Sequence, residues 1–278
     1  MDKNEKKEKY YLTEVDKIDS SIYCHHNQMG EIFIEEHDHY KGQFIYTEGG
    51  IVHIKTTTKT HFLPARHYMW IPPNTKHAIY PRTPEVIMRN LYFPIQKNDS
   101  AFYRTEGIYP ISDLLRLMLC YTRKWSGDIL KTDKEKFPIV TAFKVLLPQI
   151  SQKPLMLTLP RANDPRLQKM VYYLKDNLDK NISLNEIASY LNMSERSFHR
   201  LFKGDFKMTF IHYYTLLRMF KAVEYILENK YTIGEIALMV GYSSLPTFSN
   251  TFSKILGKRP TEYLRGNNIY NDNQQYQQ

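Results

Sequence analysis

The chain has 278 residues and 42% hydrophobic content, which suits two domains with real cores. Its formal net charge of +9 favours polyanionic partners, but the basic excess is spread over both halves of the chain, so charge alone does not indicate DNA. The two cysteines lie far apart, which argues against a disulfide scaffold. No stretch approaches the ~20 apolar residues of a membrane span, and the charged first nine residues are not expected to be a signal peptide. We therefore expect a cytoplasmic, nucleoid-associated protein.

The first part of the chain is predicted to form a small barrel. Residues 1–9 are nearly all charged and are predicted to be disordered. Gly49 and Gly50 are predicted to form a hairpin turn. Many short strands with regular turns are typical of a small β-barrel or jelly roll. Apolar and polar residues alternate in short runs at 31–35, 43–46, 51–55, 67–71 and 86–93.

From about Tyr109 the apolar residues recur at helical spacing, which predicts two helices up to residue 150. The second of these is predicted to end at Pro148. Residues 151–163 contain two prolines among polar residues and are predicted to be an interdomain linker. Asp164 or Asn163 is then predicted to cap a helix that has Pro165 at its first position.

The most informative stretch contains the same pattern twice, about 50 residues apart, at residues 183–202 and 232–252. Each copy predicts a short helix, a tight turn at Asn192 or Gly241 and a second helix. This is the helix-turn-helix arrangement, whose second helix, here called the reading helix, enters the DNA major groove. Two capping boxes are predicted at the starts of the copies, Ser183 with Glu186 and Thr232 with Glu235.

One long helix is predicted between the two copies, over residues 209–229. At 1.5 Å per residue it spans roughly 30 Å, and successive major-groove faces lie ~34 Å apart. A helix of this length would hold the two reading helices about one turn of duplex apart. After it, residues 266–278 are polar and of low complexity and are predicted to be disordered.

Residues 164–265 resemble the paired helix-turn-helix domain of the AraC/XylS family of bacterial transcription regulators. Lys207 departs from the family pattern, which usually has Gly there, while Gly204 precedes it by three residues. The first reading helix is therefore expected to end early or differently. The matching residues are Ile187, Ala188, Ser194, Phe198, Phe202, Lys203, Phe210, Leu217, Arg218, Ala222, Ile236, Ala237, Gly241, Tyr242, Phe248, Phe252, Gly257, Pro260 and Tyr263.

The N-terminal region more loosely resembles the cupin-like sensor domain that many regulators of this family carry. His37-Asp38-His39 with Gln43 is similar to the first cupin motif, and Pro72-Pro73 with His77 is similar to the second. The resemblance implies an α+β multidomain protein: a cupin-like β-barrel with following helices, and a C-terminal all-α domain of seven helices. The expected ranges are 10–105 for the barrel, 106–150 for a helical region, 151–163 for the linker, 164–265 for the DNA-binding domain and 266–278 for the tail.

Three interpretations of the barrel histidines stay open. They could bind a divalent metal through imidazole nitrogens, act as polar barrel residues without a ligand, or help to line an effector pocket with aromatic walls. Because Gln43 replaces the carboxylate ligand of cupins, no metal and no cofactor are expected. The predicted effector-pocket residues are His37, His39, Gln43, Tyr46, Trp70 and His77.

The DNA contacts are predicted from the outward faces of the two reading helices and from the helix starts. An Arg that donates to guanine is the commonest specific base contact, and helix N-termini offer N–H groups to phosphates. Arg218 is equally interpreted as a structural residue. Base contacts are predicted for Glu195, Arg196, His199, Arg200, Lys203, Leu245, Pro246, Thr247, Asn250 and Thr251. Phosphate contacts are predicted for Ser183, Ser194, Arg218, Thr232, Ser244 and Lys254.

The chain is therefore interpreted as a sequence-specific transcription regulator, an activator rather than a repressor, and not an enzyme. The expected partners are promoter or operator DNA, RNA polymerase and a small-molecule effector. The resemblance also implies a possible homodimer: Leu115, Met118 and Leu119 either form its seam or pack onto their own barrel. The alternatives are a cupin-type metal-binding protein or metalloenzyme with an accessory helical domain, and an adaptor that has lost DNA affinity.

Overall fold

The computed structural model describes residues 12–28, 33–81, 86–151 and 153–266. The chain divides into two compact units, one from residues 1–57 and 63–156 and the other from residues 58–62 and 157–278. The disorder predicted for residues 1–9 and for the tail after residue 266 lies outside the described residues.

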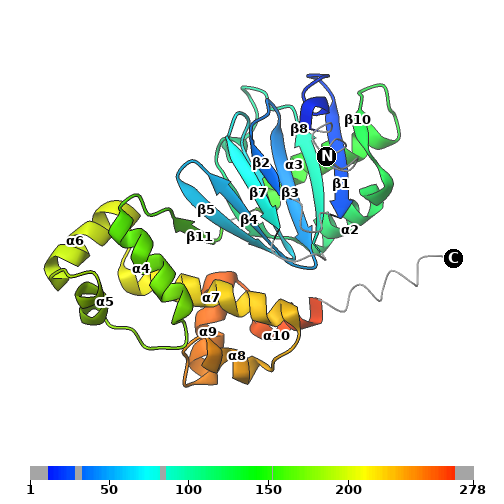
Figure 1. Ribbon diagram of the computed structural model, residues 1–278. Coiled ribbons are helices and arrows are strands. Elements are labelled where there is room, and N and C mark those ends of the chain that lie inside the picture. Colours follow the sequence, from blue (N-terminus) through cyan, green and yellow to red (C-terminus); the bar gives the residue numbers. More distant parts are fainter. Residues whose placement is uncertain (1–11, 29–32, 82–85, 152, 267–278) are drawn as a thin grey trace, which may run out of the picture. The chain divides into compact units, whose positions relative to one another are not determined.

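Most of the strands belong to the first unit and form two antiparallel sheets (Figure 1). The strand order is β10-β1-β8-β3-β6-β9 in the larger sheet and β11-β5-β4-β7-β2 in the smaller one. The predicted α+β class is confirmed, although the strands form two sheets and not one closed barrel. The strands are β1 (Ile22–Gln28), β2 (Ile34–His37), β3 (Gly42–Glu48), β4 (Ile51–Thr56), β5 (Lys59–Pro64), β6 (His67–Ile71), β7 (His77–Pro81), β8 (Ile87–Phe93), β9 (Gly107–Pro110), β10 (Gly127–Ile129) and β11 (Thr158–Pro160).

The main core of the first unit lies between one face of the larger sheet and the helices α2 (Asp113–Tyr121) and α3 (Lys136–Ile150). Two short 3-10 helices, η1 (Ala101–Arg104) and η2 (Thr122–Lys124), accompany them. Every residue of β3 from Gly42 to Thr47 is buried, because both faces of this strand are covered. Phe44 and Tyr46 join the core on the helix side, whereas Gln43 contacts His77 of the smaller sheet.

Several local predictions for this unit are wrong in detail. Gly49 and Gly50 do not form a hairpin, because β3 and β4 belong to different sheets and the connection leads from one sheet to the other. The helix α3 does not end at Pro148 but continues to Ile150. A proline in the last turn removes only one backbone donor, so the helix tolerates it there.

The apolar stripe of α2 packs within its own chain. Leu115 and Leu119 are fully buried in the core, and Met118 packs against the same cluster. The seam of a homodimer, which was one interpretation of these three residues, is therefore not built from them. Their burial against the larger sheet is the interpretation that the structure supports.

The described residues of the second unit form seven helices, as predicted. None of the helices in the described ranges combines the length and the apolar character that crossing a membrane requires. The helices are α4 (Pro165–Asp176), α5 (Leu184–Tyr190), α6 (Glu195–Phe206), α7 (Phe210–Glu228), α8 (Ile233–Met239), α9 (Leu245–Leu256) and α10 (Pro260–Gly266).

The long helix α7 is the centre of the second unit. Thr209 caps its start, and Asn229, in the left-handed conformation, ends it, so the predicted boundaries are confirmed. Figure 1 shows α5 and α6 along one part of α7, and α8 and α9 along the other. Residues 58–62 also belong to this unit, and the ring of Phe62 stacks on Phe220 of α7 with 4.0 Å between centroids.

The end of α6 explains the departure from the family pattern. The helix does not end at Gly204 but continues through it to Phe206, and nothing lies within 4 Å of the place where a Cβ of Gly204 would be. Lys207 then ends the helix in the left-handed conformation with φ 55°. A side chain is strained in that conformation, and Gly is the residue that adopts it at least cost.

This arrangement predicts that two opposite glycine changes both stabilise the protein. Gly204→Ala removes backbone freedom at an open helical position, and Lys207→Gly relieves the left-handed strain. Each should raise the free energy of unfolding by about 0.5 to 1 kcal/mol. Urea unfolding of the two variants measures this, and a loss of stability in Gly204→Ala would show that the helix does not continue through residue 204.

Candidate functional site

The first helix-turn-helix consists of α5, a turn at Asn192 and α6. Asn192 has φ 54°, the left-handed conformation predicted for it. Phe198, Phe202 and Phe206 are buried and fix the inner face of α6. The outer face carries the residues for which base contacts are predicted, all of them exposed: Glu195, Arg196, His199, Arg200 and Lys203.

The second helix-turn-helix consists of α8, a turn at Gly241 with φ 78° and α9. Phe248, Phe252 and Leu256 fix its inner face. Leu245 is 46% exposed. The other predicted contact residues of α9 are Pro246, Thr247 and Asn250, which are exposed, and Thr251, which is half-buried. Charge is therefore concentrated on α6, and the outer face of α9 is mostly neutral.

Hydroxyl groups cap the four helices of the two motifs. Thr232 and Glu235 form the predicted capping box. The other predicted box is only half made, because Ser183 accepts from the backbone of Glu186 while the Glu186 carboxylate accepts from the hydroxyl of Tyr173, 3.2 Å away. Ser194 and Ser244 also accept a backbone N–H in the first turn of their helices. Their side chains are thus engaged in the caps.

Arg218 does not have the surface position that a phosphate contact requires. Its side chain on α7 is 8% exposed. The guanidinium donates to the backbone oxygen of Leu178 at 3.0 Å and to that of Lys180, and it lies 4.3 Å from the ring centre of Tyr214. It also lies against Gly241, in the turn of the second motif. The structural interpretation of Arg218 therefore replaces the predicted phosphate contact, whereas Lys254 is exposed.

Arg166 is a basic residue near the first motif that the sequence analysis missed. It lines a pocket of about 420 Å³ together with Arg200 and the start of α6 at Ser194. Asp164 holds its guanidinium through two hydrogen bonds of 3.0 and 2.7 Å. Arg166 could have been found from the sequence, because it is a basic residue at the second position of a helix that begins with Pro165.

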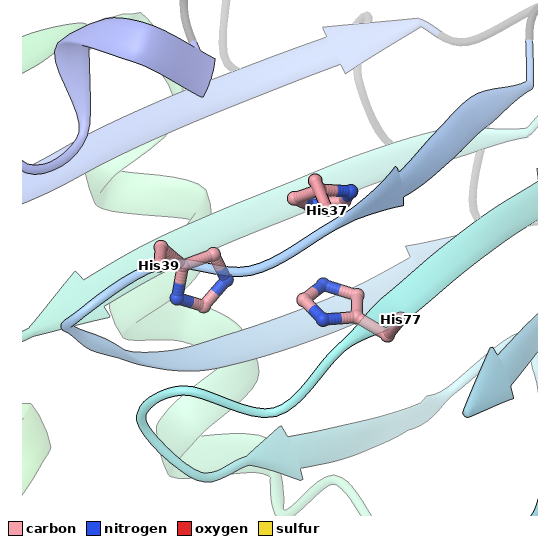
Figure 2. A group of neighbouring side chains, drawn as sticks. All are labelled: His37, His39 and His77. Carbon is pink, nitrogen blue, oxygen red and sulfur yellow. The ribbon is translucent and has the colours of Figure 1, made fainter. Parts of the chain in front are cut away.

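The three predicted histidines of the first unit form one cluster (Figure 2). His37 ends β2, His39 lies in the following loop and His77 begins β7. Each ring offers one nitrogen, and these atoms all lie within 4.8 Å of one another. His39 and His77 are buried, and His37 is half-buried. The cluster lies where the two sheets face each other, beside Gln43 of β3.

Burial keeps these imidazoles neutral. It lowers the pKa of His37 and of His39. Burial also lowers the pKa of His77 well below its ordinary value, and the neighbouring His37 and His39 lower it further. The second nitrogen of His37, Nε2, is buried and has no hydrogen-bond partner among the described residues. Burial therefore favours the uncharged form of all three rings.

Tyr46 and Trp70 do not belong to this site, although they were predicted to line it. Both are buried in the core on the helix side of the larger sheet, and the Trp70 Nε1–H donates to the Tyr103 backbone oxygen at 3.1 Å. Side chains alternate between the two faces of a strand, so Tyr46, three residues after Gln43, and Trp70, which pairs with Phe44, point to the opposite face of the sheet. Asn90 of β8, which the sequence analysis did not single out, contacts Gln43 instead.

Comparisons with known proteins cover the second unit and, for some relatives, more of the chain. Residues 187–266 match a family model described as a helix-turn-helix domain. The HTH-type transcriptional regulator GbdR of Pseudomonas aeruginosa is 27% identical over 183 residues, which are 66% of this chain and 48% of GbdR. The HTH-type transcriptional regulator NimR of Escherichia coli is 23% identical over 243 residues, which are 87% of this chain and 86% of NimR.

Among solved structures, the C-terminal domain of AraT, a response regulator from Geobacillus stearothermophilus, is similar to part of this chain. It is 32% identical with a TM-score of 0.36, covering 38% of this chain and 88% of that domain. The chain spans about half of the length of GbdR and most of the length of NimR.

The contact between Arg218 and the second turn predicts that Gly241→Ala is strongly destabilising. A Cβ at this position would lie 2.8 Å from the Leu178 oxygen and would also meet the Arg218 guanidinium, at a left-handed φ. The free energy of unfolding should fall by about 2 kcal/mol or more. Gly234→Ala is the matched control, since its nearest atom would lie 3.9 Å away. Equal stability of both variants in urea would contradict the proposed contact.

Proposed function

Through residues 187–266 the chain belongs to the AraC-type family of helix-turn-helix transcription regulators, and we propose that it reads two adjacent major-groove segments of duplex DNA. The observation that carries this proposal is the duplicated motif. Each copy buries the inner face of its second helix and leaves the outer face exposed. A helix with a fixed inner face and a free polar outer face is what insertion into a groove requires.

The spacing of the two reading helices supports binding to adjacent turns of one duplex. Both motifs pack along α7, whose 19 residues span roughly 28 Å. Successive major-groove faces lie about 34 Å apart. A pair of short helices mounted at different points along a rod of this length matches one helical turn of DNA.

The charge distribution supports different roles for the two helices. On α6 we assign base contacts to Arg196 and Arg200, with Glu195, His199 and Lys203 beside them. On α9 the neutral set from Leu245 to Thr251 favours contacts with thymine methyl groups and with adenine. The backbone N–H groups at the starts of α5, α6, α8 and α9, together with Lys254 and Arg166, then serve as phosphate contacts.

For the whole chain we propose an effector-modulated activator that acts on promoter DNA with RNA polymerase in the cytoplasm, and not an enzyme. The first unit, approximately residues 10–150, serves as the sensor, and residues 164–265 serve as the DNA-binding domain. Effector binding at the histidine cluster would shift the population that is competent for DNA. A homodimer stays part of the proposal, through a surface other than Leu115 and Leu119.

Selection from a pool of random duplexes with the full-length protein tests the DNA-binding proposal. Enrichment of one site with two half-sites about 10 base pairs apart is the expected result. If no sequence is enriched and the protein shows no duplex affinity even at low salt, the proposal is wrong.

Two single substitutions separate base contacts from phosphate contacts. Arg200→Ala should weaken binding to the selected site by about 1 to 3 kcal/mol and relax the preference at one base pair. Lys254→Ala should weaken binding on all sequences alike and reduce the salt dependence by about one ion. Binding assays on the selected duplex and on single-base variants measure both. A uniform loss for Arg200→Ala would assign that residue to a phosphate.

A further inference from the structure

We propose that His37, His39 and His77, together with the side-chain oxygen of Gln43, form a binding site for one divalent first-row transition-metal ion between the two sheets. The inference uses only residues of the first unit and does not depend on the proposed DNA binding. It revises the expectation from the sequence that these residues hold no metal.

The first step is the protonation of the three rings. In each histidine the Nδ1 atom contacts a backbone oxygen: that of Glu35 for His37 at 2.8 Å, that of Lys41 for His39 at 2.6 Å and that of Thr75 for His77 at 2.7 Å. A carbonyl oxygen only accepts, so each Nδ1 carries the proton. A neutral ring then has a free lone pair on Nε2, and this is the arrangement by which proteins orient histidine as a metal ligand.

The second step is the position of Gln43. Its side-chain oxygen lies 3.0 Å from Nε2 of His77 and 3.3 Å from Nε2 of His39. Its nitrogen donates to Asn90 Oδ1 at 2.9 Å and to the Tyr92 hydroxyl at 3.0 Å, which fixes the oxygen toward the histidines. In this orientation the Gln43 oxygen and two ring nitrogens face one another with lone pairs and without a proton between them.

The third ring nitrogen without a proton is Nε2 of His37, which is buried and unpaired within the described residues. The ring centres of His37 and His77 are 4.3 Å apart, and those of His39 and His77 are 5.2 Å apart. Facing lone pairs in a buried site raise the free energy of the fold, because buried acceptors without a donor are costly. A cation at the common point converts this repulsion into coordination.

The donor set defines the class of ion. Three imidazole nitrogens and one neutral oxygen suit zinc, iron(II), cobalt(II) or nickel(II), and they do not suit calcium or magnesium, which require several oxygen ligands. At bond lengths of 2.0 to 2.1 Å a tetrahedral ion needs ligand atoms roughly 3.4 Å apart. The nitrogen atoms lie within 4.8 Å of one another, so no pair has to close by more than about 1.4 Å when the ion binds.

One metal-free arrangement satisfies Gln43, His39 and His77, although it leaves Nε2 of His37 without a partner among the described residues. If the amide groups of Gln43 and Asn90 were both turned over, the Gln43 nitrogen would donate to His39 and His77. The Asn90 nitrogen, which has no partner among the described residues, would then donate to the Gln43 oxygen. The positions of the heavy atoms are alike in the two arrangements, so metal uptake distinguishes them.

The test is metal uptake by the full-length protein after exhaustive treatment with a chelator. Cobalt(II) should bind with one equivalent per chain and give the visible absorption bands of a four- or five-coordinate ion, and zinc(II) should displace it. The melting temperature should rise with either ion, because ligand binding to the folded state stabilises it. A folded protein that takes up no stoichiometric cobalt or zinc would overturn the proposal and favour the metal-free arrangement.

Variants assign the uptake to the cluster. His37→Ala, at a half-buried position, should weaken cobalt binding by at least about 100-fold, more than the 10- to 100-fold typical of residues behind the ligands. His212→Ala, at an exposed position on α7, is the matched control and should leave it unchanged. Gln43→Glu should tighten binding, since a carboxylate replaces a neutral oxygen. Uptake that survives in His37→Ala, with circular dichroism unchanged, would place the ion elsewhere and overturn the site.

Discussion

The buried guanidinium of Arg218 is the interaction on which the geometry of the second unit depends. It lies on α7 and donates to the backbone oxygens of Leu178 and Lys180, just before the first helix-turn-helix begins. The same group lies against Gly241, in the turn of the second motif. A planar group with five fixed donors suits this task, and a lysine would not reproduce it. One side chain of the central helix therefore fixes where both motifs start and turn.

A second polar contact plays a comparable part in the first unit. Gln43 connects strand β3 of the larger sheet with His77 of the smaller sheet, and with Asn90 and Tyr92 of strand β8. Burying a polar group between two sheets costs free energy of folding unless the group is hydrogen-bonded. Such a network therefore favours the one arrangement of strands in which every partner is present. The opposite face of the larger sheet is filled by aromatic residues and two helices. The polar side and the apolar side of one strand thus have separate tasks.

The sequence predicted the second unit more closely than the first, for a physical reason. Helix starts and turns are determined by local chemistry: Thr209, Asn229, Asn192 and Gly241 all have roles that their residue types suggest. Strand β3 was found, but its alternation did not tell which face meets the histidines, because both faces are buried. Strand β6 is likewise buried along its whole length, so both Tyr46 on β3 and Trp70 on β6 were misplaced for this reason. Asn90 was missed because its role arises only from pairing between distant strands.

The stacked rings of Phe62 and Phe220 have a consequence for protein engineering and for evolution. Phe62 is separated from α7 by most of the first unit in sequence, yet both belong to the second compact unit. The second compact unit, for which we propose DNA binding, is therefore not a continuous stretch of the sequence. A chimera that joins a foreign N-terminal domain at residue 160 would lack Phe62 and its stacking on Phe220. Residues 58–62 therefore have to be included in such a chimera together with helices α4 to α10.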